Sequence, residues 1–305
     1  MLIKKDEFMK KYDLNYFVKG INYLKKNLLF FNVSNSNIRD LAYKNYCYKK
    51  LFKKYKKTII DFKNSGKKEF SDYIWVCWFQ GLENAPDLVK SCIKSVENNF
   101  PNKKVIIITY ENMYDYVSFP DYIIKKRNRG LISNAHFSDL LRLRLLNQYG
   151  GMWIDSTVFV SGKVDEKFWK NELFCFKELS LFPKEELPIR ASNWLIYSTS
   201  NNDILVLTEK LLYDYYKREL YVKNYYIFHL FFSMASKKFQ DQWDKVPSFS
   251  NINNHILQFE LEKKYSYERW SDILKITSFH KLNRRVNIED KESNYYHIIK
   301  EFRSE

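Results

Sequence analysis

A strand, a helix and a second strand in succession constrain the fold of this chain more than any other feature of its sequence. Residues 73–79 form a short apolar run that is closed by Gln80, and residues 105–109 form a second such run. Between them, residues 86–98 begin at a proline and carry apolar side chains at helical intervals. This pattern predicts a right-handed βαβ unit with two buried parallel strands. We therefore expect an α/β fold whose ligand lies at the carboxyl ends of the strands.

The first 70 residues have a different character, because they are basic and helical. Within residues 49–57, lysines alternate with apolar and aromatic side chains, as in basic amphipathic helices that lie on a membrane surface. The same apolar stripe is equally compatible with packing against the rest of the protein. We expect a helical N-terminal region over residues 1–70, followed by an α/β domain over residues 71–305, and both interpretations of the N-terminal region stay open.

The charge and the cysteines limit the partners and the compartment. A net charge of +15 attracts phosphorylated ligands, anionic membranes or nucleic acid without choosing among them. The sequence has no Arg/Gly-rich tract or zinc-knuckle spacing, so nucleic acid is not an expected partner. The cysteines are scattered and form no C-x-x-C pair, which indicates a reducing compartment. Without a signal-peptide pattern or an apolar run of the roughly 18 residues that span a bilayer, we expect a cytoplasmic protein, soluble or peripheral on the inner face of the membrane.

A charged pair lies in a strongly apolar helix near the middle of the chain. Residues 135–149 predict this helix, and Gly150 and Gly151 end it. Asp139 and Arg142 are three residues apart, so they lie on the same side of the helix. An internal ion pair accounts for them without any functional role. The segment that follows this helix favours a binding site over a purely structural ion pair.

Asp155 stands at the end of a predicted buried strand, since it comes directly after the apolar residues 152–154. A carboxylate at the carboxyl end of a buried strand, beside a helix that carries Asp and Arg, lies where an α/β sheet binds its ligand. A sugar nucleotide matches these groups. Its diphosphate needs a metal ion or cations, its hydroxyl groups need carboxylate acceptors, and its base needs an aromatic face.

The same residues resemble the signature of GT-A glycosyltransferases with a DXD-type motif, and in particular the bacterial capsular polysaccharide synthesis branch of glycosyltransferase family thirty-two. The signature reads Ser138-Asp139-x-x-Arg142 and then Tyr149-Gly150-Gly151-x-Trp153-x-Asp155. Further stretches that match this branch are residues 74–81, 193–196, 226–229 and 278–282. The resemblance covers roughly residues 70 to 285, and it implies the GT-A fold, a Rossmann-like α/β fold that binds nucleotide-diphospho-sugars.

The resemblance also implies roles for individual residues in a site for a UDP-sugar. Trp78 is expected to stack on the uracil, Asp139 and Arg142 to bind hydroxyl groups of the donor sugar, and Asp155 to hold the ribose and a divalent metal. The expected catalytic residues are Asp139, Arg142 and Asp155. Further contacts with the donor are expected from Gln80, Ser156 and Asn193.

A metal ion, Mn2+ or Mg2+, is part of this expectation, but one position departs from the family pattern. Thr157 stands where the family usually has a second Asp, and a hydroxyl group is a poorer cation ligand than a carboxylate. His280 is expected to join Asp155 on the metal, and Lys281 to point towards the diphosphate. The other histidines are interpreted as structural, with His229 as a candidate for the acceptor cleft.

The implied reaction is the transfer of a hexose from UDP-glucose or UDP-galactose to a glycan acceptor, with retention of the anomeric configuration. The expected acceptor is an oligosaccharide linked to polyprenyl diphosphate, in the synthesis of capsular or surface polysaccharide. Two alternatives remain. One is a toxin-like glycosyltransferase that modifies a protein: the chain resembles clostridial glucosylating toxins, which act on host proteins, in its Asp-x-x-Arg and Asp-x-Asp layout, although their delivery modules are missing here. A non-catalytic module that binds nucleotides or phospholipids would also account for the missing second Asp.

Overall fold

The centre of the molecule is a five-stranded sheet with the strand order β2-β1-β3-β6-β5. The computed structural model describes residues 5–302 except 163, 165, 180–186 and 287. The strands are β1 (Tyr73–Cys77), β2 (Lys104–Ile108), β3 (Gly151–Asp155), β5 (Leu173–Lys177) and β6 (Ala191–Ser198). β1 is parallel to both β2 and β3, whereas β6 is antiparallel to β3 and β5 is antiparallel to β6. The predicted α/β class is confirmed, with a mixed rather than a purely parallel sheet.

The apolar runs of the sequence are explained by burial on both faces of the sheet. Trp75 and Cys77 of β1 belong to one hydrophobic core, and Ile74 and Val76 belong to the core on the opposite face. The helix α3 (Asp87–Asn99) connects β1 to the parallel strand β2, as the βαβ prediction required. A strand with polar side chains on one face could not be covered in this way, because buried polar groups need partners.

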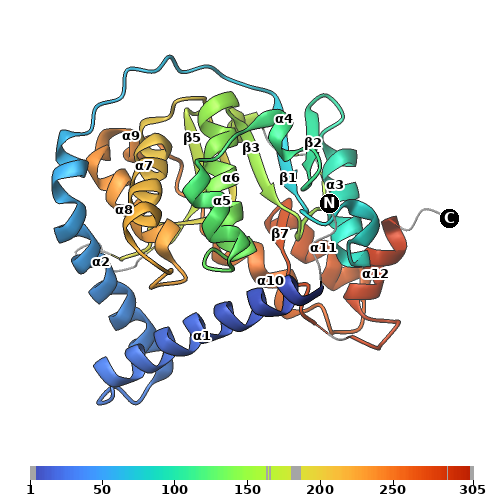
Figure 1. Cartoon of the computed structure of the whole chain (residues 1–305). Helices are drawn as coiled ribbons and strands as arrows, with labels where there is room; N and C mark the ends of the chain where they lie inside the picture. The colour runs from blue at the N-terminus through green and yellow to red at the C-terminus, as the bar shows by residue number, and fades with distance from the viewer. Residues whose placement is uncertain (1–4, 163, 165, 180–186, 287, 303–305) are drawn as a thin grey trace.

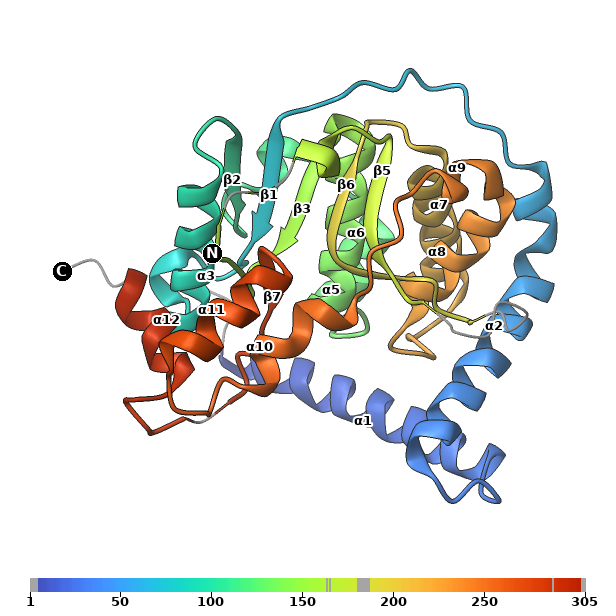
Figure 2. The same ribbon diagram turned by 180° about the vertical axis from the view of Figure 1, so that it is seen from behind.

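Helices cover both faces of the sheet, so that the fold has three layers (Figures 1 and 2). The first face carries α4 (Met113–Tyr116), α5 (Asp121–Asn128), α6 (Asn134–Tyr149), α7 (Asp203–Arg218), α8 (Ile227–Lys238) and α9 (Gln240–Asp244). The second face carries α3 and a group of C-terminal helices, α10 (Ile256–Phe259), α11 (Tyr267–Ile276) and α12 (Asn294–Phe302). The central helix α6 lies between the sheet and α7, which explains why ten of its 16 residues are buried.

The N-terminal region forms a pair of long helices, α1 (Lys5–Leu29) and α2 (Ser36–Asp61). α2 packs on α7 and α8 through Tyr55 and Ile59, which are buried in the main core, and the Tyr55 ring meets Phe231 edge-on at 5.2 Å. An extended segment then leads over the top of the domain into β1 (Figure 1). Packing of the apolar stripe of α2 is therefore observed, whereas α1 leaves many apolar side chains exposed. No helix in the described parts of the chain is both long and apolar enough to cross a membrane.

Strand register brings the ends of several segments together at one edge of the sheet. Cys77 pairs with both Ile108 and Asp155, so the carboxyl ends of the three parallel strands are level. A two-stranded sheet lies beyond this edge, in which β4 (Val158–Val160) pairs antiparallel with β7 (Phe279–Lys281). The chain segment around residue 280 is thereby placed next to the end of β3.

Gly151 is required by the close approach of β3 to β1. Its φ is +95°, and a Cβ atom at this position would lie 2.3 Å from the carbonyl oxygen of Tyr73. We expect Gly151→Ala to lower the free energy of unfolding by about 2 kcal/mol or more, because backbone strain and displacement of a paired strand add together. Urea unfolding followed by circular dichroism measures this change. Gly162→Ala is the matched control, since a Cβ there meets nothing within 4 Å. Equal unfolding midpoints for the two variants would contradict the argument.

Candidate active site

The carboxylate of Asp155 is the centre of a group of charges at the end of β3. Its Oδ1 accepts hydrogen bonds from the Trp153 indole at 2.9 Å and from the Arg142 guanidinium at 3.2 Å. Its Oδ2 accepts one from the Lys281 ammonium at 3.0 Å. The side chain is 25% exposed, so this end of the group is open to a ligand. Helix α6, strand β3 and strand β7 thus meet at one carboxylate.

Arg142 and Asp139 lie deeper, on the side of α6 that faces the sheet. Arg142 Nη1 donates to the carbonyl oxygen of Asn193 at 2.6 Å and lies 3.4 Å from Asp139 Oδ1. The Asn193 side-chain amide donates to the same Asp139 oxygen at 2.9 Å. The guanidinium also lies over the Trp153 ring, with its Cζ 4.8 Å from the ring centroid. The structure therefore brings the predicted residues Asp139, Arg142, Asp155 and Asn193 together, with Arg142 between the two carboxylates.

The two carboxyl groups differ in their electrostatic environment. Burial raises the pKa of Asp139 to about 7, although nearby Arg142 opposes this shift. Burial also acts on Asp155 and by itself would raise its pKa, but Lys281 and Arg142 outweigh it and hold that pKa below its ordinary value. Asp155 is thus ionised at neutral pH, while Asp139 is close to its titration midpoint.

Lys281 connects the end of β3 with Thr157. Its ammonium donates to Asp155 Oδ2 at 3.0 Å and to the Thr157 hydroxyl oxygen at 2.6 Å. Antiparallel pairing of Lys281 with Val158 places the two segments side by side and directs the lysine side chain across the strand end. The lysine predicted to point towards a diphosphate is therefore part of the site, and it fills the space between Asp155 and Thr157.

His280 does not reach Asp155, which corrects the prediction that these two residues share a metal. Its Nε2 is 2.8 Å from the Ser161 hydroxyl, its ring packs near Phe159, and the side chain is fully buried. Burial lowers its pKa to about 3. The physical reason is strand alternation: consecutive side chains of β7 point to opposite faces, and the face towards Asp155 is taken by Lys281.

The donor atoms around Asp155 do not fit a divalent metal ion. Both carboxylate oxygens already accept hydrogen bonds from cationic side chains, and the Thr157 hydroxyl accepts one from Lys281. In sites that bind phosphates, Mg2+ is typically held by one or two carboxylates together with waters and phosphate oxygens. Of the Asp-x-Asp pair only the Asp155 carboxylate is present here, and the Lys281 ammonium already contacts its Oδ2. Nowhere in the described part of the chain do three or more His, Cys, Asp or Glu side chains gather to hold a metal. The expected metal centre is therefore not formed by these residues.

The remaining predicted residues lie at the same edge of the sheet. Trp78 and Gln80 follow β1 directly, and Ser156 follows β3, with Gln80 exposed and the other two partly exposed. The Trp78 indole nitrogen is buried and donates to no group among the described residues. The Arg284 guanidinium lies 5.2 Å from the centroid of the Trp78 ring. The stacking role predicted for Trp78 stays a prediction, and the ring is placed where a planar ligand could reach it.

Two contributors were missed by reasoning from the sequence. Trp153 was assigned only to the apolar strand and to the family signature, with no role of its own, yet its indole donates to Asp155. The signal was present, because residues two apart on a strand point to the same face. Arg284 had no comparable signal, since its position over Trp78 depends on the path of the chain after β7. His229 lies near Arg142 on α8, where burial lowers its pKa to about 3, and its assignment to the acceptor cleft stays a prediction.

Comparison with known families identifies the group to which this architecture belongs. Residues 26–299 match the family described as capsular polysaccharide synthesis protein. The chain belongs to this family. The match extends from the end of α1 to α12, so it includes Asp139, Arg142, Asp155 and Lys281.

Individual relatives are more distant. The chain is 30% identical over 105 residues to the "O-glycosyltransferase braB" of Annulohypoxylon truncatum, a segment that covers 32% of this chain and 25% of that protein. The chain therefore spans about a quarter of the length of this curated relative. Among solved structures, the "PaToxG Glycosyltransferase" is similar over 85% of this chain and 98% of that chain, with 16% identity and a TM-score of 0.36. This structural likeness is too distant to support an argument.

The raised pKa of Asp139 predicts a pH dependence of stability. Between its ordinary value of 3.8 and about 7, the folded protein keeps a proton that the unfolded chain has released, so stability falls as pH rises through this window. We expect a contribution of up to about 1.4 kcal/mol per pH unit. Asp139→Asn should remove it, because the amide does not titrate. Urea unfolding from pH 4 to pH 8 measures the effect, with Asp115→Asn on the exposed surface of α4 as the control. Parallel stability profiles for wild type and Asp139→Asn would refute the prediction.

Proposed function

We propose that this protein is a glycosyltransferase that transfers a hexose from a UDP-sugar to a glycan acceptor in the synthesis of capsular or surface polysaccharide. One observation carries the proposal. Asp139, Arg142, Asp155 and Lys281 form a row of alternating charges that begins at the buried Asp139 and ends with the partly exposed Asp155 and Lys281 at the ligand-binding edge of an α/β sheet. A buried row of this kind is costly unless it is neutralised, so its position at this edge favours a binding site over a purely structural role. Membership of the capsular polysaccharide synthesis family supports the same conclusion.

Each residue of the site has a role that its chemistry supports. Asp155 and Asp139 offer oxygen acceptors for ribose and hexose hydroxyl groups, and Arg142 keeps the two carboxylates apart and oriented. Trp78 provides an aromatic face and an unpartnered indole N–H for the uracil. Ser156 directly follows Asp155, and Gln80 lies two residues after Trp78, so both are proposed to contact the nucleotide. Lys281 supplies positive charge for the diphosphate.

The proposed reaction retains the anomeric configuration. The bond between the anomeric carbon and the β-phosphate oxygen breaks, and the acceptor hydroxyl forms a new bond to that carbon from the same face. The hydroxyl proton passes to the departing phosphate oxygen, so that UDP leaves with the electron pair of the broken bond. Catalysis then consists mainly in stabilising the negative charge on the departing diphosphate. The position of the Lys281 ammonium beside Asp155 supports this role for its positive charge.

The first test concerns Asp155. We expect Asp155→Asn to lower both transfer and hydrolysis of UDP-glucose or UDP-galactose by about a hundredfold or more, because the amide cannot hold Lys281 and Arg142 in place by charge. Release of UDP measures turnover, and circular dichroism checks the fold. Asp115→Asn serves as the control and should retain full activity. Full activity in Asp155→Asn would refute the assignment, and binding of UDP-sugars by the wild type without turnover on any acceptor would favour a non-catalytic module.

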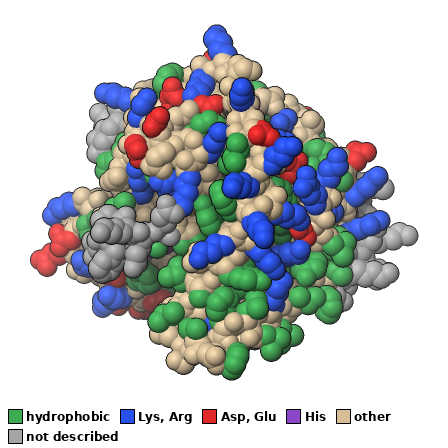
Figure 3. Space-filling view, turned by 90° about the vertical axis from the view of Figure 1, so that its left-hand side faces the viewer, with side chains coloured by type: hydrophobic (Ala, Val, Ile, Leu, Met, Phe, Trp, Pro, Cys, Tyr) green, Lys and Arg blue, Asp and Glu red, His purple; other side chains and the backbone are tan. Residues whose placement is uncertain are grey.

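The acceptor is proposed to be an oligosaccharide linked to polyprenyl diphosphate, which places the protein on the inner face of a membrane. The turn between α1 and α2 supports this location. Leu28 and Phe31 are each 75% exposed there, and Leu24 and Ile38 are exposed beside them. Figure 3 shows apolar side chains gathered at the lower end of the face that carries these helices, below Lys and Arg side chains. We call this group of four exposed residues the apolar tip.

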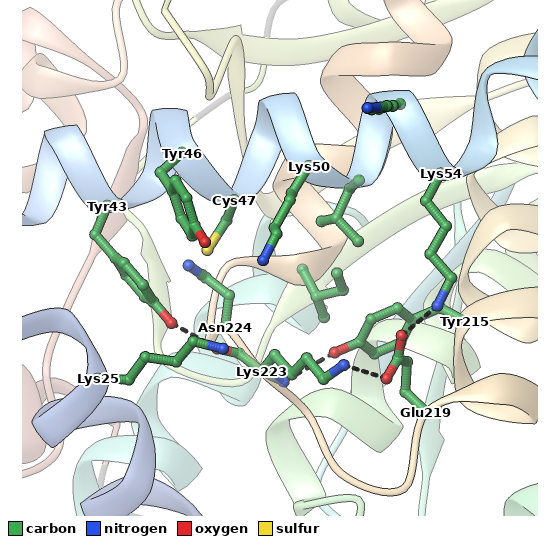
Figure 4. Close-up of a pocket in the computed structure, with 13 residues that line it drawn as sticks. Lys25, Tyr43, Tyr46, Cys47, Lys50, Lys54, Tyr215, Glu219, Lys223 and Asn224 are labelled. Carbon is green, nitrogen blue, oxygen red and sulfur yellow. Dashed lines mark hydrogen bonds and ion pairs between the residues drawn. The ribbon is translucent and has the colours of Figure 1, made fainter. Parts of the chain in front are cut away.

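Positive charge surrounds the apolar tip and a nearby cavity. Residues 14–60 contain eleven Lys and Arg residues, and Asp40 is their sole acidic residue. A cavity of about 510 Å³ lies between α2 and the α7–α8 connection, where the side chains of several lysines surround it (Figure 4). These lysines are Lys25, Lys50, Lys53, Lys54 and Lys223. Apolar side chains next to basic ones are the combination that binds anionic lipid surfaces.

Vesicle binding tests the membrane location. We expect the wild type to float with vesicles that contain phosphatidylglycerol and to lose this binding in the double variant Leu28→Asp, Phe31→Asp, because two carboxylates would have to enter the lipid surface. The matched control is Ile60→Asp, Phe70→Asp, which changes two exposed residues at the far end of α2 and in the segment after it. Equal flotation of the wild type and the tip variant would refute the proposed surface.

A further inference from the structure

We infer that the Lys281 ammonium is the permanent cation of this site, and that it takes the place of a divalent metal ion between Asp155 and Thr157. The inference rests on the proposed function, because it assigns the partner of Lys281 as the diphosphate of the nucleotide-sugar donor. It follows from three features of the site: the position of the ammonium, the balance of charge and the direction of His280.

The position of the ammonium is the first feature. Lys281 Nζ lies 3.0 Å from Asp155 Oδ2 and 2.6 Å from Thr157 Oγ1, so it joins the two residues that would hold a metal in an Asp-x-Asp motif. A dication in the same space would meet a positive charge at close range. Two like charges a few ångströms apart in a partly buried site repel each other strongly, because little water lies between them to screen the repulsion. A metal could bind there only after Lys281 had left both partners.

The balance of charge is the second feature. Within the row, the charges of Arg142 and Lys281 compensate those of Asp139 and Asp155 when both carboxyl groups are ionised. Thr157 contributes no charge, whereas a second Asp in its place would leave an excess negative charge for a metal to neutralise. The exchange of Asp for Thr and the presence of Lys281 are therefore complementary. One removes a metal ligand, and the other supplies the missing cation.

The direction of His280 is the third feature. On β7, Lys281 faces Asp155 and His280 faces Ser161, so the strand can present the lysine or the histidine to the site but not both. A shift by one residue would break the β4–β7 pairing and bury the lysine charge. The lysine is thus held at the site by the register of a strand pair.

The ammonium keeps capacity for a ligand. Lys281 has three N–H donors, of which Asp155 and Thr157 take two, and no third acceptor lies among the described residues. Its side chain is 20% exposed. A phosphate oxygen that approaches the open end of the site would take the third hydrogen bond. The charge that stabilises the diphosphate is therefore built into the chain.

Calorimetry with UDP as the probe tests this inference apart from activity. We expect the wild type to bind UDP with the same affinity in EDTA and in millimolar MnCl2. Lys281→Met should weaken UDP binding about tenfold or more, as expected for the loss of a charge-assisted hydrogen bond, and should leave uridine binding unchanged. Lys281→Arg should restore much of the UDP affinity. Thermal unfolding of each variant without ligand checks that it is folded.

A second variant tests the exchange of lysine for metal in the opposite direction. We expect the double variant Thr157→Asp, Lys281→Met to bind UDP well with Mn2+ and poorly in EDTA, because the second carboxylate creates the anionic pair that a metal needs. If Mn2+ raised the UDP affinity of the wild type about tenfold over EDTA, the inference would be overturned while the proposed function stood. If the wild type bound UDP under neither condition, the proposed function would fail, and the inference with it. Equal UDP binding by Lys281→Met and the wild type would also overturn it.

Discussion

The carboxylate of Asp155 imposes the constraint on which the rest of this structure depends. A carboxylate that is three-quarters buried at the end of an apolar strand is unstable unless cations and hydrogen-bond donors surround it. Here they come from three separate elements, Trp153 of β3, Arg142 of α6 and Lys281 of β7. Neutralising this one group therefore ties the central helix and a C-terminal strand to the edge of the sheet.

This constraint explains several features of the packing nearby. Helix α6 must lie close to the sheet for Arg142 to reach Asp155, and Gly150 and Gly151 allow the chain to turn from the helix directly into β3. The Trp75 indole donates to the carbonyl oxygen of Gly150 at 2.9 Å, which fixes this turn against β1. Because the helix and the strand are joined by so short a turn, the positions of Arg142 and Asp155 are coupled through the backbone as well as through the ion pair.

The N-terminal helices relate to this site differently. α2 packs on α7 and α8. The first turn of α8 contains Phe228, and the Arg142 guanidinium lies 5.7 Å from the centroid of its ring. The lysine-lined cavity and the charged site therefore both contact the first turn of α8, which contributes Ile227 to one and Phe228 to the other. In the proposed function, α1 and α2 contact the membrane that holds the lipid-linked acceptor, and the end of β3 binds the donor.

Much of this arrangement could be predicted from the sequence, because it depends on local periodicity. The apolar runs predict β1, β2 and β3, the helical pattern predicts α6, and the spacing of Asp139, Arg142 and Asp155 predicts that they meet at the sheet edge. The reversed direction of β6, which is antiparallel to both β3 and β5, could not be predicted in the same way, since a strand buried on both faces has the same apolar pattern whichever way it runs.

The orientation of residues 280 and 281 is the clearest example of a feature that the local sequence could not predict. The sequence determined that a histidine and a lysine stand next to each other in a short apolar segment, and that Thr157 replaces an aspartate. Only the tertiary structure decided which of the two side chains faces Asp155, because a shift of one residue in a three-residue strand exchanges them. The pairing of Val158 with Lys281 settles that choice, and it joins segments more than a hundred residues apart. No local pattern encodes such a register, since it depends on the packing of both strands against the same core.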